Sequence, residues 1–203
     1  MARFGSDAFW KARYDNEVEN FEWFADLSDS LASCPPLKAL LASRAASKAH
    51  VLEIGCGTSR VAEELWDTFG FRHISAIDNQ PKAIEYCKQR QGADRSIDFR
   101  CQDMTALTDF ASKSIDLVFD KGALDALVCR GGEDLGKCAA ELWRVMKPKE
   151  TSILIALSNA PLTEVVDGLK PWFKKEDMWM VENQKVGQLM AKAYLFSRRK
   201  KKL

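Results

Sequence analysis

The chain has 203 residues, of which 46% are hydrophobic and 29% charged, and its formal net charge is +1. This length and composition predict one soluble globular domain over residues 1–203 with a full core. A net charge this small provides no strong field for nucleic acid or for an anionic membrane, so neither is expected as a partner. No apolar run reaches transmembrane length, and the first ten residues lack the apolar segment of a secretory signal.

Six cysteines are scattered along the chain, at positions 34, 56, 87, 101, 129 and 138. They form no C-x-x-C pair, and only His50 and His73 are available as histidine partners, so neither a metal site nor a disulfide framework is expected. Free thiols are typical of a reducing compartment, here the cytosol with the mitochondrial matrix as an alternative. A monomer is the expected state.

The first 33 residues are rich in aromatic side chains, among them Trp10, Tyr14 and Trp23. Their latter part is expected to be helical from Phe24, with Leu27 and Leu31 on the same face. Aromatic stripes usually cover a core, which favours a structural role. The alternative is a lid over a ligand pocket, which would bring Arg13 near a carboxylate. A helix over 37–46 follows the prolines at 35 and 36.

The stretch HVLEIGCGTS, residues 50–59, predicts a buried strand that runs into a glycine turn at Gly55 and Gly57. Thr58 or Ser59 is expected to cap the next helix, which ends at Gly70. Such a turn lets a ligand approach the backbone and the free N–H groups of a helix. The third glycine of the dinucleotide fingerprint is absent, because Arg60 stands there, which disfavours a nicotinamide or flavin cofactor.

Two acidic residues follow the next two predicted strands. Asp78 ends the strand 73–78, 23 residues after Gly55, where an acid holds a ribose diol, and Asn79 adds a polar contact. The alternative for Asp78 is a cap for the helix 81–90. Asp103 stands at the end of the predicted strand SIDFRCQDM, residues 96–104, and is suited to accept from an adenine amino group, with the N–H of Met104 donating to the ring. A turn aspartate is the alternative there.

The stretch SIDLVFDKGALDALVC, residues 114–129, predicts another buried parallel strand followed by a helix. Asp120 stands at the carboxyl end of this strand and is expected to face the site. Asp125 lies on the following helix. An ion pair between Lys121 and Asp125 is an alternative, in the less favourable orientation for a helix.

The remaining elements alternate helix and strand, which predicts a parallel sheet with helices on both faces. They are helices near 133–145 and 162–170, a strand at 151–158, and late strands near 177–186 and 190–198. The alternation around Tyr194 indicates a less buried edge region. The basic tail, 199–203, is interpreted as a solvated terminus.

The acidic residue Glu53 before Gly55-x-Gly57, together with Asp78 and Asp103, resembles class I S-adenosylmethionine-dependent methyltransferases. The resemblance implies a Rossmann-like, doubly wound sheet of seven strands in the order 3-2-1-4-5-7-6, with the last strand antiparallel. It divides the chain into a helical cap (1–48), a core (49–198) and the basic tail.

The segments FWKARY, FEWF and DKGALDAL are similar to those of methyltransferase-like protein-lysine methyltransferases, which include enzymes for elongation factor one-alpha and citrate synthase. Lys11, Ala123 and Pro148-Lys149-Glu150 depart from the family pattern. The resemblance implies S-adenosylmethionine as cofactor, no metal, and a wide set of binding residues: Trp10, Arg13, Tyr14, Trp23, Glu53, Gly55, Gly57, Asp78, Asn79, Asp103, Met104 and Asp120. It also raises the lid interpretation of the N-terminal aromatics above the structural one.

The expected function is methyl transfer to a lysine of a protein substrate, with Asp120 or Asp125 as candidate catalytic residues that orient the amine. A neutral amine aligned with the methyl group is the main requirement of such a transfer. Two alternatives stay open. The acceptor is a small molecule or RNA, or the chain is a non-catalytic binding protein on the same fold.

Overall fold

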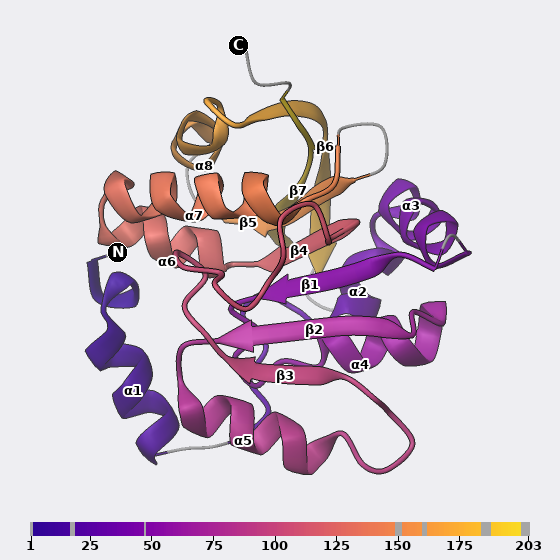
Figure 1. The fold of residues 1–203 in the computed structure, drawn as a ribbon, viewed down its shortest axis with the longest axis vertical. Coiled ribbons are helices and arrows are strands. Elements are labelled where there is room, and N and C mark those ends of the chain that lie inside the picture. Colours follow the sequence, from indigo (N-terminus) through magenta and orange to yellow (C-terminus); the bar gives the residue numbers. More distant parts are fainter. Residues whose placement is uncertain are drawn as a thin grey trace.

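The computed structural model describes residues 2–16, 19–46, 48–148, 152–159, 162–183 and 188–199. Its strands form one sheet in the order β3-β2-β1-β4-β5-β7-β6 (Figure 1). They are β1 (His50–Ile54), β2 (His73–Asp78), β3 (Asp98–Cys101), β4 (Leu117–Lys121), β5 (Ile153–Ser158), β6 (Phe173–Asn183) and β7 (Gln188–Arg198). β1 to β5 pair in parallel, and β7 is antiparallel to both of its neighbours. The predicted strand order and antiparallel β7 are confirmed.

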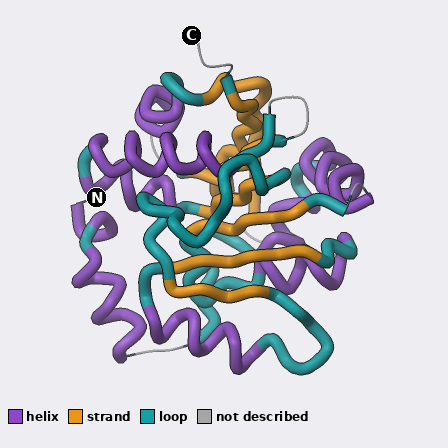
Figure 2. Tube along the Cα trace, viewed as in Figure 1, coloured by secondary structure: helices purple, strands orange, loops and turns teal. Residues whose placement is uncertain are grey.

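Helices cover both faces of this sheet, as predicted (Figures 1 and 2). The described helices are η1 (Ala2–Gly5), α1 (Asp7–Asn16), α2 (Leu27–Ala32), α3 (Pro35–Ala46), α4 (Val61–Glu64), η2 (Leu65–Phe69), α5 (Pro81–Arg90), α6 (Ala123–Arg130), α7 (Gly132–Val145) and α8 (Leu162–Leu169). α1 lies beside the carboxyl ends of the parallel strands, on the left in Figure 1.

Two apolar clusters separate the sheet from its helices, because successive side chains of a strand point to opposite faces. Val51 packs with Leu37 and Val61, on the side of α2 to α5. Leu52 packs on the other side with Leu142 of α7. Strands buried on both faces explain the continuous apolar runs in the sequence.

The N-terminal region differs from its prediction. The helix expected from Phe24 begins only at Leu27, because the Asp26 side chain accepts the N–H of Asp29 and caps α2 at that point. Phe24 lies in the preceding loop. An additional helix, α1, occupies the first aromatic stretch.

The helix after the glycine turn is also irregular. α4 has four residues and continues as one π-helical turn, η2, which ends at Gly70 with φ +79°. That end agrees with the prediction. The expected cap is different, because Arg60 holds the N-cap position. Ser59 Oγ accepts the N–H of Val61 at 3.3 Å, whereas the Thr58 hydroxyl bonds to the N-terminal region.

The interpretation of the Tyr194 region as a less buried edge is wrong. β7 lies between β5 and β6, and Tyr194 is buried. β6 is the edge strand and begins at Phe173, earlier than predicted. Part of the expected strand 177–186 and most of the basic tail lie outside the described residues.

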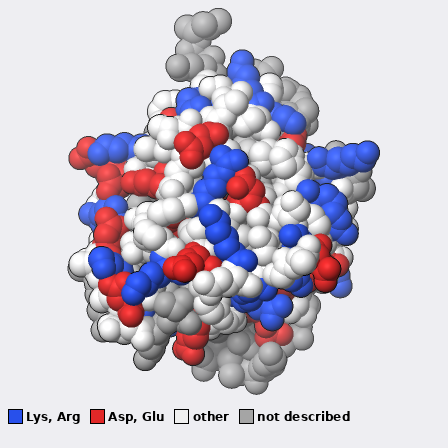
Figure 3. All heavy atoms as spheres, turned by 60° about the horizontal axis from the view of Figure 1, so that its bottom comes forward, with Lys and Arg blue, Asp and Glu red and all other residues white. Residues whose placement is uncertain are grey.

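The surface mixes charges of both signs, as Figure 3 shows for one face. Among the described residues, no helix is both long enough and apolar enough to cross a bilayer.

Candidate active site

One pocket lies at the carboxyl ends of β1, β2 and β4 and encloses about 880 Å³ with its open mouth included. These strand ends lie beside α1 in Figure 1. It is lined by Asp7, Trp10, Tyr14, Phe21, Trp23, Glu53, Gly55, Cys56, Gly57, Ser59, Asp78, Asn79, Gln102, Asp103, Met104, Lys121, Gly122, Ala123, Ala126, Leu127 and Arg130. The carboxyl ends of strands in open parallel sheets are the usual place for a ligand. The pocket therefore brings together every predicted binding residue except Arg13 and Asp120.

The glycine turn forms one wall of the pocket. Gly55 and Gly57 have φ values of +58° and +52°, which other residues rarely adopt. A Cβ on Gly55 would overlap the Cβ of Ala123, and one on Gly57 would lie 2.5 Å from the Tyr14 hydroxyl. Both positions therefore need glycine, because the backbone has a positive φ and because Ala123 and Tyr14 lie too close to leave room for a Cβ.

Asp78 joins the end of β2 to this turn. Its Oδ2 accepts the N–H of Gly57 at 2.8 Å, and its Oδ1 accepts the N–H of Gln80 at 2.9 Å. Burial raises the pKa of Asp78 to about 6, although the two backbone hydrogen bonds favour its ionised form. The carboxylate thus holds the turn and the start of α5 while it faces the pocket.

Asn79 and Asp103 complete the polar side of the pocket. The Asn79 amide donates to Asp7 Oδ1 of α1 at 3.1 Å, which ties the N-terminal helix to β2. Asp103 Oδ1 accepts both the N–H and the hydroxyl of Thr105 at 2.8 Å. Asp103 therefore stabilises a turn, the alternative considered from sequence, and also lines the pocket.

Residues 19–26, called the strap below, form the aromatic wall. Phe21 and Trp23 of the strap line the pocket together with Trp10 and Tyr14 of α1. Their rings contact one another, with the Trp10 and Trp23 centroids 5.6 Å apart. The N-terminal aromatics thus border the pocket, as the lid interpretation expects.

A buried ion pair fastens the strap to β4. The Lys121 ammonium is bonded to Glu22 Oε2 and donates to the Ala25 carbonyl at 2.9 Å. Glu22 Oε1 also accepts the N–H of Arg60. The expected alternative pair between Lys121 and Asp125 is therefore wrong, since the Lys121 side chain points toward the strap.

Two pocket residues carry buried polar atoms that lack a hydrogen-bond partner among the described residues. They are Trp23 Nε1, a donor, and Glu53 Oε2, an acceptor when the carboxyl is ionised. Burial and then Glu63 raise the pKa of Glu53 well above its usual range. A ligand with both an acceptor and a cationic group would satisfy these two atoms.

Arg13, Asp120 and Asp125 lie behind the pocket walls. The Arg13 guanidinium stacks on Phe21, with 3.8 Å between Cζ and the ring centroid. Asp120 Oδ1 accepts the N–H groups of Ala123 and Leu124, at 2.9 and 3.1 Å, and so caps α6. Burial and then Asp125 raise the pKa of Asp120 well above its usual range.

Asp125 is engaged at the end of β5. Its Oδ1 accepts the Ser158 hydroxyl, and its Oδ2 accepts the N–H of Asn159 at 2.8 Å. Asp120 and Asp125 therefore fix α6 against the carboxyl ends of β4 and β5, and neither side chain lines the pocket.

Comparison with known proteins identifies the family. The family model described as a methyltransferase domain matches residues 52–154, which is half of the chain. The chain belongs to this methyltransferase family. The matched region holds the glycine turn, Asp78 and Asp103, and the strand order is the one that the resemblance to S-adenosylmethionine-dependent methyltransferases implies.

Relatives of this methyltransferase include the mouse eEF1A lysine and N-terminal methyltransferase, 31% identical over 90% of this chain and 25% of that protein. The zebrafish mitochondrial citrate synthase-lysine N-methyltransferase is 27% identical over 65% of this chain and 57% of that protein. The chain thus spans about a quarter of the mouse protein and just over half of the zebrafish protein.

A solved structure shares the fold of this methyltransferase. The N-methyltransferase NodS of Bradyrhizobium japonicum, in complex with S-adenosyl-L-homocysteine, has a TM-score of 0.63 and 16% identity, with 94% of this chain and 99% of that chain covered. At this identity the likeness establishes the fold alone.

The pocket residues fit S-adenosylmethionine. Its methionine end carries a carboxylate and an ammonium group, which match the unpartnered donor of Trp23 and the unpartnered oxygen of Glu53. The glycine turn leaves space that a Cβ would fill. Among the described residues, no group of three or more His, Cys, Asp and Glu side chains is placed to hold a metal.

Sequence reasoning missed several residues of the site. Glu22, Gln102 and Arg130 border or support the pocket, and each depends on a contact between distant segments. The Arg130 guanidinium, for example, bonds to Asp7 and to the Gly5 carbonyl across more than 120 residues. No local spacing indicates such contacts.

Proposed function

We propose that this methyltransferase transfers a methyl group to the side chain of a lysine in a protein substrate, such as a translation elongation factor. The observation that carries the proposal is the 31% identity over 90% of the chain to an enzyme named an eEF1A lysine and N-terminal methyltransferase. A relative named a citrate synthase-lysine N-methyltransferase supports lysine as the acceptor residue. The cytosol is the proposed compartment, with the mitochondrial matrix as the alternative.

The same proposal assigns the pocket residues to parts of the methyl donor. Asp78 and Asn79 would hold the ribose hydroxyls, since a carboxylate accepts two hydrogen bonds. Asp103 and Met104 would hold the adenine. When bound, S-adenosylmethionine supplies an activated methyl group on a sulfonium.

At the methionine end, the indole N–H of Trp23 would meet the carboxylate, and Glu53 would meet the ammonium. Trp10 and Tyr14 would cover the donor and exclude water. Arg13 would contribute positive charge to this end from behind Phe21.

The acceptor lysine must be neutral, because its free pKa is about 10.4 and the ammonium form is not nucleophilic. Exclusion of water by the strap and α1 would favour the neutral amine. Asp120 and Asp125 act in this proposal by positioning α6 at the pocket, because both are hydrogen-bonded to backbone N–H groups. Alignment of amine and methyl group then provides most of the acceleration.

The test is to incubate the chain with tritium-labelled S-adenosylmethionine and a cell lysate, separate proteins on a denaturing gel, and map the modified residue by mass spectrometry. A discrete labelled band modified on lysine, and absent with Asp78→Ala, supports the proposal. Donor binding without any labelled protein would contradict it and favour a small-molecule or RNA acceptor.

A further inference from the structure

Arg90, the last residue of α5, lies directly behind the glycine turn. Its Nη1 donates to the Thr58 carbonyl at 2.5 Å, and its Nη2 donates to the Ser59 carbonyl at 2.6 Å. Its Nε donates to Glu63 Oε1 at 2.7 Å. One guanidinium thus holds two consecutive carbonyls of the turn and a carboxylate of α4. Only a planar fork of N–H donors is able to do this.

The two faces of the turn have different partners. On the pocket side, Asp78 accepts the N–H of Gly57, and both residues line the pocket. On the other side, Arg90 binds the Thr58 and Ser59 carbonyls and does not line the pocket. The peptide units between Gly57 and Ser59 are therefore clamped between an acidic and a basic side chain. Their orientation determines where the N–H groups of the turn point.

Arg90 also reaches the strap. Its Nη1 donates to Asn20 Oδ1 at 3.1 Å. Beside this contact, the Thr58 hydroxyl donates to the Glu19 carbonyl at 2.6 Å and accepts the N–H of Phe21 at 3.2 Å. Phe21 is part of the aromatic wall of the pocket. Arg90 and Thr58 thus join the glycine wall to the aromatic wall.

The groups around Arg90 hold its guanidinium in one position. The Arg90 side chain is 17% exposed and that of its partner Glu63 is 1% exposed, so the pair is largely removed from water. The guanidinium also lies over the Tyr86 ring, with 5.2 Å between Cζ and the centroid. A buried charge with this many partners has little freedom to move, and truncation would leave several of them unsatisfied.

We propose that Arg90 is a positioning residue for binding of the methyl donor. It sets the conformation of the turn 57–59 and links that turn to the strap, so that both walls of the pocket are in place before the donor arrives. This inference rests on the proposed assignment of the donor to the pocket.

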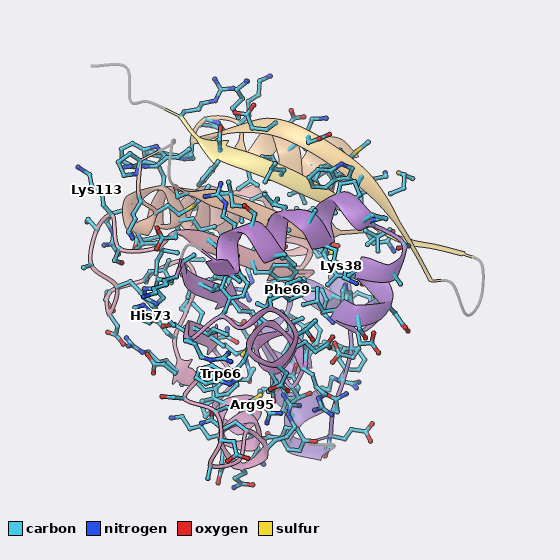
Figure 4. The ribbon with its side chains drawn as sticks, turned by 90° about the vertical axis from the view of Figure 1, so that its right-hand side faces the viewer. Lys38, Trp66, Phe69, His73, Arg95 and Lys113 are labelled. Carbon is cyan, nitrogen blue, oxygen red and sulfur yellow. The ribbon has the colours of Figure 1, made fainter. Side chains whose placement is uncertain are left out.

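The first experiment compares Arg90→Lys with Arg95→Lys by calorimetric titration of S-adenosylhomocysteine. Lysine keeps the charge of Arg90 but is unable to span both carbonyls, so we expect Kd to rise about tenfold or more. Arg95 lies just beyond α5, where its guanidinium binds Asp67 on the side of the molecule seen in Figure 4, away from the pocket. Its variant is expected to keep the wild-type Kd.

The second experiment separates positioning from general stabilisation. Asn20 is exposed, so Asn20→Ala is expected to fold and to weaken S-adenosylhomocysteine binding about threefold. If Arg90 acts by linking turn and strap, the effects of Asn20→Ala and Arg90→Lys on Kd are not additive. Steady-state kinetics should show a raised KM for the donor with little change in kcat. If Arg90→Lys fails to fold, Asn20→Ala alone decides through its Kd for S-adenosylhomocysteine: a rise of about threefold supports the link between turn and strap, and an unchanged Kd overturns it.

Three outcomes have distinct meanings. A raised Kd in Arg90→Lys with non-additive coupling to Asn20→Ala supports the inference. Wild-type Kd in Arg90→Lys, additive effects, or an unchanged Kd in Asn20→Ala overturns it. Wild-type protein that does not bind S-adenosylhomocysteine contradicts the proposed function itself, which the Arg90 variants do not test.

Discussion

Asp78 is the residue whose ionisation should control donor binding. Burial raises its pKa to about 6, and only its ionised form accepts hydrogen bonds from two ribose hydroxyls. We therefore predict that the affinity for S-adenosylhomocysteine is constant from about pH 7 to 8. Below pH 6 it should fall by up to tenfold per pH unit. Calorimetric titration across this range measures the effect.

The control for this pH dependence is Asp78→Asn, which keeps the size of the side chain and removes its titration. Glu53 also lines the pocket and has a raised pKa, so the test is the difference between the two profiles: the Kd of Asp78→Asn should change less between pH 5 and 7 than the wild-type Kd. A wild-type affinity that stays flat down to pH 5 would mean that the Asp78 carboxylate does not contact the donor.

Gly57 and Gly92 form a matched pair for testing the close approach at the turn. Both have positive φ, +52° and +72°, but a Cβ meets the Tyr14 hydroxyl only at Gly57. We predict that Gly92→Ala costs about 1 kcal/mol of unfolding free energy and leaves donor binding unchanged. Gly57→Ala should weaken S-adenosylhomocysteine binding at least about tenfold, because Tyr14 must move. Equal affinities of the two variants would contradict this account.

For single residues of the site, the sequence predicts those that follow the end of a strand. It does not predict those that are joined by contacts between distant parts of the chain. Gly55 and Asp78 were predictable because a strand, a turn and an acid at a given spacing place them at one edge of the sheet. The bond between Lys121 and Glu22 spans 99 positions. Helical spacing offers Asp125 as an alternative partner for Lys121, but this spacing does not apply, because Lys121 is the last residue of β4.

At the scale of elements, the attachment of the strap to β4 can be tested through one ion pair. Its Glu22 is paired with Lys121, whose side chain is 4% exposed, so Lys121→Met leaves a partly buried carboxylate without its counter-ion. We predict a loss of about 3 kcal/mol in unfolding free energy, measured by urea denaturation. The surface variant Lys137→Met, which breaks exposed pairs with Glu133 and Asp134, should cost less than about 1 kcal/mol.

The double variant Glu22→Gln with Lys121→Met provides the control for this pair. Because both charges are removed together, its loss should be smaller than the sum of the two single losses. Additive losses would show that the pair does not hold the strap.

Among elements, the parallel strands were predicted well and the N-terminal segments poorly. β1, β2 and β4 are continuous apolar runs bounded by turns, which have few other interpretations. α2 begins where Asp26 caps it, three residues after the aromatic run that suggested an earlier start. β7 has small and polar residues at alternate positions, which suggested an edge strand. It is an inner strand because β6 pairs with its outer side, and no local pattern in the sequence shows this pairing.

For the whole molecule, stability should fall in mild acid through His50. Burial, together with the stacked ring of His73 at 3.5 Å, lowers the pKa of His50 to about 4. His73 lies on the face shown in Figure 4. Since an unfolded histidine has a pKa near 6.5, the unfolded chain binds more protons between pH 6.5 and 4. The contribution of His50 is therefore fully present above pH 6.5 and is lost as the pH falls toward 4.

The expected result is a Tm that drops between pH 7.5 and 5 by about 3 °C more in the wild type than in His50→Gln. Glutamine is able to keep the hydrogen bond that His50 Nε2 makes with the Ser75 hydroxyl at 3.1 Å. Asp116 and Lys147 also face His50, with opposite effects on its pKa, and they are unchanged in both proteins. If Tm falls equally with pH in the wild type and in His50→Gln, His50 is not the source of the loss of stability.

The central claim is that the pocket at the carboxyl ends of β1, β2 and β4 binds the methyl donor through Asp78. Calorimetric titration of S-adenosylhomocysteine into wild type, Asp78→Ala and the exposed control Asp67→Ala tests it most directly. We predict binding at one site in the wild type and in Asp67→Ala, and a loss of at least about a hundredfold in Asp78→Ala. Wild-type affinity in a folded Asp78→Ala protein would contradict the claim.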